Sequence, residues 1–242
     1  MSEYWKHTQG GVRFGAFTPL RPADTKKIAG LLCFSHDKQP LPPLQGRSGK
    51  IRLDLTDRGS VVIKHYLRGG ALARINRRKY FGIGKSRAQQ EYAWLHRVRS
   101  IGISAPEPIA FARTTGFVHE TWLITREIDA ARSLLEAAIG PEEKTRIIMK
   151  QIVLEIGKLI RAGIFHVDLH PGNILLDGRS VPYIIDFDKT RRYRGTHEKL
   201  AKKYIHRWNR AVIKHGLPRI LSESFSAGIQ SFIDNSGETG VG

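Results

Sequence analysis

The stretch HVDLHPGNILLD at residues 166–177, followed by YIIDFD at 183–188, decides how this sequence of 242 residues is interpreted. Asp168 and Asn173 are five residues apart, and Asn173 and Asp186 are thirteen apart. All three come between a long apolar helical pattern and a short β-branched strand. A plainer interpretation is that HPGN is a simple turn and that each aspartate only caps a neighbouring element. The three together favour a site rich in oxygen ligands.

These residue types suit phosphoryl transfer. The reaction needs a carboxylate that orients the attacking hydroxyl and accepts its proton, and hard oxygen ligands for a magnesium ion on the nucleotide phosphates. We therefore predict Asp168 as the catalytic residue and Asn173 and Asp186 as metal ligands, with ATP and Mg²⁺ as cofactors. His166 is explained by packing as well as by catalysis.

The same spacing resembles the catalytic and metal-binding loops of protein kinases and their small-molecule relatives. DFD stands here in place of DFG. Because Asp188 lacks the backbone freedom of glycine, we expect a permanently formed site rather than a flipping activation segment.

A lysine on a strand and a glutamate on the next helix test this interpretation independently. Lys64 lies on the apolar face of the strand VVIKHY, and Glu91 lies on the apolar stripe of a helix that follows a capping box at Ser86. Losing one partner of a buried ion pair costs about 3–5 kcal/mol. We therefore predict that the two pair and that Lys64 holds the inner phosphates, unless Lys64 extends to solvent and Glu91 faces water.

The order of elements predicts an α+β, bilobal protein-kinase-like fold, with a small antiparallel-sheet N-lobe and a mostly helical C-lobe. The predicted parts are an extension at 1–40 with no clear pattern, an N-lobe at 41–126 and a C-lobe at 127–236. A crevice near 126–130 would bind a ligand. Gly46 and Gly49 form a loop that could approach its phosphates, although a two-glycine turn is also a common hairpin feature.

Charge and cysteine content limit the class of protein. The chain has 40 Lys and Arg against 22 acidic residues, a balance of +18 that favours polyanionic partners. The excess lies at 64–99, with ten basic residues to one acidic, and at 189–219, with eleven to one. The only cysteine, Cys33, excludes a disulfide framework and is expected to be a buried thiol. Without an apolar leader or an 18-residue apolar run, we expect a cytoplasmic protein that is soluble or peripherally attached to a membrane.

With these residues in view, the sequence resembles the lipopolysaccharide kinase family, in particular the 3-deoxy-D-manno-octulosonic acid (Kdo) kinases of Gram-negative bacteria. The resemblance spans about Gly46 to Arg194. The segment KHYLRGGALARINRRKYFGIGKSRAQQEY at 64–92 is similar to the family's strand, glycine pair and basic helix, an insert that general protein kinases lack. The resemblance implies transfer of the terminal phosphate of ATP to a hydroxyl of Kdo on a lipid A precursor, at the cytoplasmic face of the inner membrane.

The sequence leaves the identity of the phosphate acceptor open. His170 and Pro171 replace a polar pair usual in the family, and HPGN is also frequent in aminoglycoside and other small-molecule phosphotransferases. The charge favours a glycolipid, because Lys and Arg near an anionic leaflet each contribute about 1 kcal/mol. The basic residues that could contact the acceptor or the membrane, unless they are only solvated helix faces, are Arg68, Arg74, Arg77, Arg78, Lys79, Arg191, Arg192 and Arg194.

Rival interpretations share part of this pattern. A lipopolysaccharide heptose kinase and a protein or small-molecule kinase would use the same centre. A pseudokinase or a basic nucleic-acid-binding module would use KKYIHRWNRAVIKHG at 202–216, where Tyr204 and Trp208 would stack on bases. We expect no nucleic-acid partner, because Asp168 and Asp186 would repel phosphate in the absence of magnesium.

Overall fold

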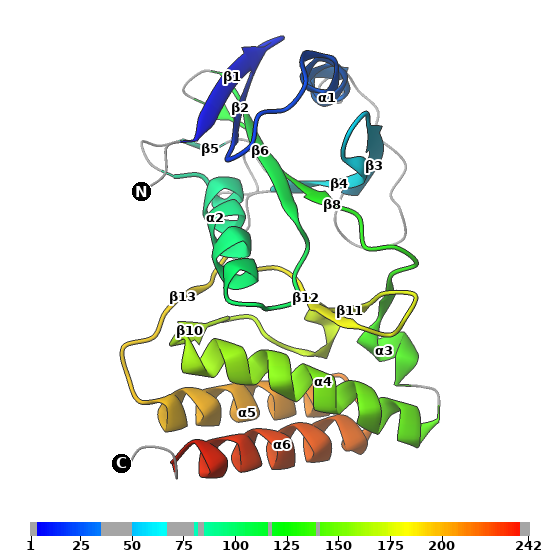
Figure 1. Ribbon diagram of the computed structural model, residues 1–242, viewed down its shortest axis with the longest axis vertical. Helices are drawn as coiled ribbons and strands as arrows, with labels where there is room; N and C mark the ends of the chain where they lie inside the picture. Colours follow the sequence, from blue (N-terminus) through cyan, green and yellow to red (C-terminus); the bar gives the residue numbers. More distant parts are fainter. Residues whose placement is uncertain are drawn as a thin grey trace. The chain divides into compact units, whose positions relative to one another are not determined.

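The computed structural model describes residues 4–34, 50–66, 80–81, 85–115, 118–138 and 141–237. The chain forms two compact units (Figure 1). The first comprises residues 1–96 and 107–127, and the second comprises 97–106 and 128–242. An antiparallel sheet dominates the first unit and helices dominate the second, so the predicted α+β class is confirmed.

The first unit is built on a six-stranded antiparallel sheet with the order β1-β2-β6-β8-β4-β3. Its strands are β1 (Trp5–Gln9), β2 (Val12–Ala16), β3 (Lys50–Leu55), β4 (Gly59–Tyr66), β6 (Pro108–Thr114) and β8 (Thr121–Arg126). The short strands β5 (Tyr80–Phe81) and β7 (Val118–His119) pair with each other. Gly10 and Gly11, both with positive φ, form the tight turn that joins β1 to β2. The N-terminal residues therefore supply one edge of this sheet.

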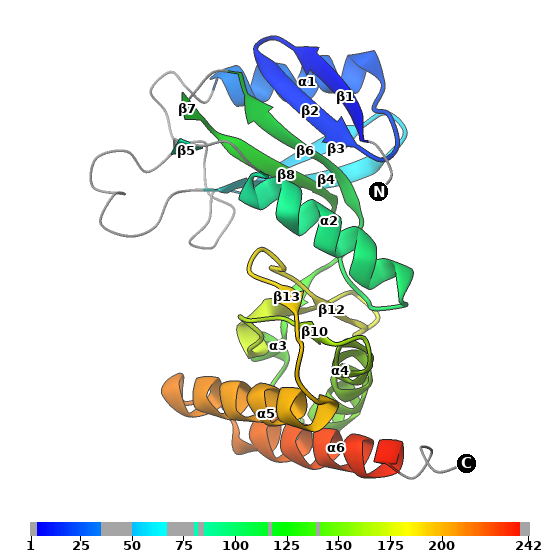
Figure 2. The same cartoon turned by 90° about the vertical axis from the view of Figure 1, so that its left-hand side faces the viewer.

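Two helices cover opposite faces of the sheet (Figure 2). Helix α1 (Pro22–Phe34) packs in the apolar core that includes Val61 and Ile63 of β4. Helix α2 (Arg87–Ser100) lies on the other face, where Lys64 points because alternate strand residues face opposite sides. The core is thus built on one side of β4 and the charged pair on the other.

The second unit packs three long helices against one another: α4 (Glu142–Arg161), α5 (His197–Lys214) and α6 (Arg219–Gly237). Trp208 of α5 stacks on Phe225 of α6 at 4.4 Å and donates a hydrogen bond to the Leu221 carbonyl. Because Trp208 and Tyr204 are both fully buried, neither offers the exposed ring that the nucleic-acid interpretation required.

Short elements complete the second unit. Strands β12 (Pro182–Ile184), β11 (Ile174–Leu176) and β9 (Arg132–Ser133) form one small sheet, and β10 (Ile164–Phe165) and β13 (Arg191–Arg192) form another. Helix α3 (Leu134–Ala137) and the 3₁₀ turn η2 (Pro171–Asn173) lie beside the first of them.

Cys33 corrects one expectation. It lies in the last turn of α1, is exposed, and its thiol donates to the Gly10 carbonyl over 3.1 Å. The buried thiol predicted from the sequence was wrong, because this residue faces solvent rather than the sheet. Among the residues that the structure describes, no helix is long and apolar enough to cross a bilayer.

Candidate active site

The HVDLHPGN segment forms a compact loop between β10 and β11. Within it, the side-chain amide of Asn173 donates to the backbone carbonyl of Asp168 over 2.8 Å. Pro171 begins the 3₁₀ turn, and His170 caps that turn by accepting the Gly172 N–H at Nδ1 over 3.1 Å. The six residues 168–173 therefore form a loop whose two ends are joined by a hydrogen bond, which fixes Asn173 relative to Asp168.

Asp186 reaches the same loop through the antiparallel pair β11–β12. The N–H of Ile185 donates to the Asn173 carbonyl over 3.0 Å, and Asp186 follows directly. Asp186 has φ = 68°, a left-handed backbone that is uncommon for a residue other than glycine. Such strained positions persist where the surrounding contacts determine them, and they gather at functional sites. The structure thus brings together the three residues that the sequence singled out.

His166 holds the two segments to each other. Its side chain is fully buried, Nε2 donates to the Ile185 carbonyl over 3.0 Å, and its ring packs edge-on against Phe187. Burial lowers the pKa of His166, and the Ile185 carbonyl, Asp186 and Asp168 oppose that shift only in part. A neutral, inward-facing imidazole has a positioning role. For His166 the structure therefore favours packing over catalysis.

Helix α5 anchors the strand that precedes the loop. The Tyr204 hydroxyl accepts the backbone N–H of His166 and donates to the Ile164 carbonyl, both over 2.8 Å. Desolvation raises the pKa of this phenol, so it stays protonated and can donate. Tyr204 was not predicted as a site residue, because the sequence pattern indicated it only as a ring that could stack on bases.

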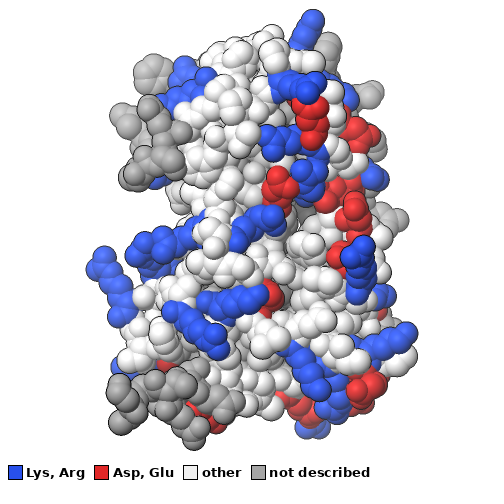
Figure 3. Space-filling model, viewed as in Figure 1, with Lys and Arg blue, Asp and Glu red and all other residues white. Residues whose placement is uncertain are grey.

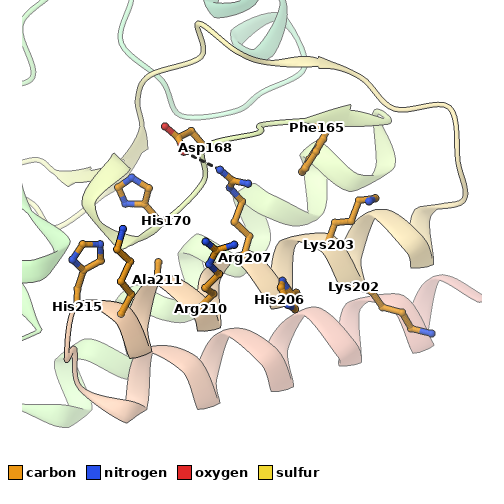
Figure 4. A pocket seen from close by; sticks show the side chains of 11 residues that line it. Phe165, Asp168, His170, Lys202, Lys203, His206, Arg207, Arg210, Ala211 and His215 are labelled. Atoms are coloured by element: carbon orange, nitrogen blue, oxygen red, sulfur yellow. Dashed lines mark hydrogen bonds and ion pairs between the residues drawn. The ribbon is translucent and has the colours of Figure 1, made fainter. Parts of the chain in front are cut away.

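Asp168 has two cationic neighbours. Arg207 of α5 donates from Nη2 to Oδ1 of Asp168 over 3.0 Å (Figure 4). The Lys189 ammonium lies 3.9 Å from Oδ2 of the same carboxylate. Arg207 is 39 residues away in sequence and was not predicted as a site residue. The available signal was its place on a basic helix after the DFD segment, which spacing alone could not connect to Asp168.

The first unit contains the predicted ion pair. Lys64 Nζ lies 2.9 Å from Glu91 Oε2, and only 3% of the Glu91 side chain is exposed. The Tyr66 hydroxyl also hydrogen-bonds to this carboxylate, and the Lys64 ammonium lies 4.8 Å from the centre of the Tyr66 ring. Tyr66 shares the strand face of Lys64 two residues on, so the period of the strand could have identified it.

The donor atoms around Asn173 and Asp186 fit magnesium. Because the amide nitrogen of Asn173 is used in the bond to Asp168, its amide oxygen remains for a metal ion. One amide oxygen and one carboxylate match the way Mg²⁺ is usually bound, with substrate phosphates and water completing the shell. The described part of the chain holds no group of three or more His, Cys, Asp or Glu residues that would form an all-protein cage.

The predicted glycine loop and the predicted basic contacts lie partly outside the described residues and partly on the exposed surface. Gly46, Gly49 and the five basic residues of the insert, Arg68 to Lys79, lie outside the described residues. Arg191, Arg192 and Arg194 are exposed, and the guanidinium of Arg191 lies 5.5 Å from the centre of the Phe165 ring. On the face in Figure 3, Lys and Arg side chains lie over both units.

Comparison with known proteins gives one family. Residues 38–228 match the model of the lipopolysaccharide kinase (Kdo/WaaP) family, a span that includes every predicted site residue. A 3-deoxy-D-manno-octulosonic acid kinase of Vibrio parahaemolyticus is 31% identical over 67% of this chain and 68% of its own length. The enzyme of the same name from Vibrio cholerae is 30% identical over 61% of this chain and 68% of its own length. A third, from Stenotrophomonas maltophilia, is 32% identical, but the match spans only about half of that protein, 53%.

Proposed function

Because the chain belongs to the lipopolysaccharide kinase (Kdo/WaaP) family, we propose that it transfers the terminal phosphate of ATP to a hydroxyl of a Kdo sugar on a lipid A precursor. The single observation that supports this chemistry most is the hydrogen-bonded unit of Asp168, Asn173 and the Asp186 segment. It combines a partly exposed carboxylate and an amide oxygen from one loop with a second carboxylate from the neighbouring segment, as phosphoryl transfer requires.

Each residue has a separate task in this proposal. Asp168 orients the attacking hydroxyl and accepts its proton as the new P–O bond forms. Asn173 and Asp186 would hold Mg²⁺, which when bound neutralises charge on the nucleotide phosphates. Lys64, held by Glu91 and Tyr66, would contact the inner phosphates, and the glycines at 46 and 49 would approach them from the backbone.

Arg207 adds a constraint on the resting site. Its bond to Asp168 orients the carboxylate, but it also occupies one of the oxygens that a substrate hydroxyl would use. An acceptor with its own negative charge would draw the guanidinium toward itself and release that oxygen. The ion pair therefore fits an anionic acceptor better than a cationic antibiotic.

We place the protein at the cytoplasmic face of the inner membrane, as a peripheral protein. The acceptor is a lipid, and the exposed Arg191, Arg192 and Arg194 form a basic segment that would meet anionic headgroups.

Substrate profiling with labelled ATP and magnesium tests the function. The purified chain is offered a Kdo-bearing lipid A precursor, a heptose-bearing core oligosaccharide, a protein and an aminoglycoside. We expect label in the Kdo-bearing acceptor. Label only in the heptose-bearing core would make it a heptose kinase, and no transfer to any acceptor would refute the kinase proposal.

The variants Asp168→Asn and Asp186→Asn link that activity to the site. Each removes one preorganised charge, so we expect at least about a hundredfold loss in kcat with little change in fold. The exposed Asp234→Asn in α6 is the matched control and should stay within about twofold of the wild type. Near-normal turnover in either site variant would overturn the assignment.

A further inference from the structure

A pocket of about 650 Å³ opens in the second unit between α5 and the catalytic loop. Asp168 and His170 contribute to its wall from the loop, and Phe165 lies toward the other end of the row of labelled side chains (Figure 4). The rest of its lining comes from α5 and from His215, which follows the end of that helix. The catalytic assignments above use Asp168 from this pocket, but they give no role to its remaining cations.

The sequence of α5 divides the helix into two faces. Leu200, Tyr204, Trp208 and Val212 recur every four residues and are buried against the rest of the unit. Lys203, Arg207, Arg210 and Lys214 recur every three or four residues and line the pocket instead. The helix therefore presents a row of cations to the space beside Asp168.

Most of these cations have no negative partner within the described chain. Arg207 is bound to Asp168, and Lys202 is bound to Glu198 at 2.5 Å. The side chains of Lys203, Arg210 and Lys214 form no hydrogen bond or ion pair with any residue that the structure describes. Asp168 is the only acidic residue among the described ones that line the pocket. Like charges that converge on one cavity favour an anion within it.

His170 adds a neutral donor on the loop side. Its Nδ1 accepts the Gly172 N–H, so the neutral ring has its proton on Nε2. The loop side of the pocket therefore offers a hydrogen-bond donor without a further charge.

We infer that this pocket is the acceptor subsite, and that Lys203, Arg210 and Lys214 bind the phosphate or carboxylate groups of an acceptor whose hydroxyl lies next to Asp168. This inference rests on the proposed function. The row from 203 to 214 extends about 16 Å along the helix at 1.5 Å per residue, which is longer than one phosphate group. The subsite therefore takes an acceptor with more than one anionic group, and it excludes neutral sugars and cationic antibiotics.

The test compares two triple variants that each remove three positive charges. The pocket variant is Lys203→Gln, Arg210→Gln and Lys214→Gln. The control changes exposed cations that do not line this pocket: Lys144→Gln, Lys150→Gln and Arg219→Gln. A third protein, with Lys203→Arg, Arg210→Lys and Lys214→Arg, changes the same positions but keeps their positive charge. If it binds normally, the loss in the pocket variant comes from the missing charges and not from misfolding.

Two readouts separate this inference from the proposed function. The first is the KM for the Kdo-bearing lipid A precursor in the phosphotransfer assay. The second is equilibrium binding of the same precursor, in detergent micelles, without ATP or magnesium. Because hydrogen bonds to charged groups are stronger than those between neutral groups, we expect the pocket variant to weaken both by at least about tenfold. The control and the charge-keeping variant should stay within about threefold of the wild type.

Binding of three other ligands is measured with the same variants: inorganic phosphate, vesicles of phosphatidylglycerol, and a single-stranded oligonucleotide. Equal weakening by the pocket and control variants overturns the inference, because general attraction would then explain binding. Selective loss of vesicle or oligonucleotide binding, with precursor binding intact, also overturns it. Pocket-dependent precursor binding in a protein that transfers no phosphate would support the subsite and refute the kinase proposal instead.

Discussion

His166 is a buried imidazole whose neutrality links the fold to pH. Its pKa in the folded protein is lowered from the ordinary 6.5 by burial. Below about pH 6.5 the unfolded chain binds a proton that the folded chain does not, so the free energy of unfolding falls as the pH falls. The slope is at most about 1.4 kcal/mol per pH unit for each such histidine.

We therefore expect His166→Gln to reduce the loss of stability between pH 6.5 and 5. Glutamine keeps a donor for the Ile185 carbonyl but does not titrate. Urea unfolding, followed by the fluorescence of Trp208 in a protein without other tryptophans, gives the slope. Some slope should remain, because burial also lowers the pKa of His170. The exposed His197→Gln serves as the control, and an unchanged slope in His166→Gln would contradict the prediction.

Lys64 and Glu91 form a pair whose energies should not add. Removing Lys64 takes a donor from a carboxylate that is only 3% exposed and to which the Tyr66 hydroxyl also hydrogen-bonds. We expect Lys64→Met to raise the KM for ATP or lower kcat, and Glu91→Gln to reproduce part of the defect. A double-mutant cycle on kcat/KM should give a coupling of about 0.5–3 kcal/mol.

The exposed Lys26→Met in α1 is the matched control for that cycle and should leave the kinetics unchanged. Strictly additive losses would mean that the two residues act independently in the enzyme.

At the residue scale the sequence identified the residues that the structure brings together, but not the residues that hold them in place. Asp168, Asn173 and Asp186 were identifiable because loop spacing is local and the residue types are unusual between apolar elements. Arg207 and Tyr204 were not, because their partners lie 38 to 40 residues away and only packing of α5 brings them together. Local pattern has no information on which helix face meets which loop.

The element scale shows a close crossing of α4 and α6 made possible by two glycines. A Cβ atom on Gly157 would lie 2.5 Å from the Phe232 ring, and one on Gly228 would lie 2.7 Å from a methyl carbon of Val153. Neither position has positive φ, so the glycines are required for space and not for backbone conformation. Each helix gives up some intrinsic stability so that the other can approach.

We expect Gly228→Ala to lower the stability of the second unit by about 1–3 kcal/mol, because overpacking outweighs the gain of about 1 kcal/mol in helix propensity. Gly30→Ala in α1 is the matched control, since no atom lies within 4 Å of the position its Cβ would take. It should raise the stability of the first unit by about 0.5–1 kcal/mol. Differential scanning calorimetry measures both, and a stabilised Gly228→Ala would show that the helices can separate freely.

Elements were predicted unevenly for a physical reason. Helix α4 has a long apolar period, and it was expected at 141–162 and observed at Glu142–Arg161. The strands β1 and β2 have five residues each and were not identified, because a strand that short has too few alternations to distinguish from loop. They become strands by pairing, β2 with β6 nearly a hundred residues later.

At the scale of the whole molecule, the net charge has its main effect on what the protein associates with, and little effect on which fold it adopts. The balance of +18 produces a field that attracts anionic surfaces at low ionic strength and is screened at high ionic strength. Raising the salt from about 0.1 M to about 1 M shortens the Debye length from about 10 Å to about 3 Å. The membrane association that we propose for this chain should therefore depend strongly on salt.

We expect the chain to sediment with vesicles that contain phosphatidylglycerol at about 0.1 M KCl, and to remain in the supernatant at about 1 M KCl or with phosphatidylcholine alone. The exposed Arg191, Arg192 and Arg194 should account for much of the binding. At about 1 kcal/mol each, changing all three to Gln should weaken binding on the order of a hundredfold. The variant with Lys144, Lys150 and Arg219 changed to Gln loses the same charge and should bind far better. Equal weakening in the two variants would mean that total charge, and not this segment, determines binding to the membrane.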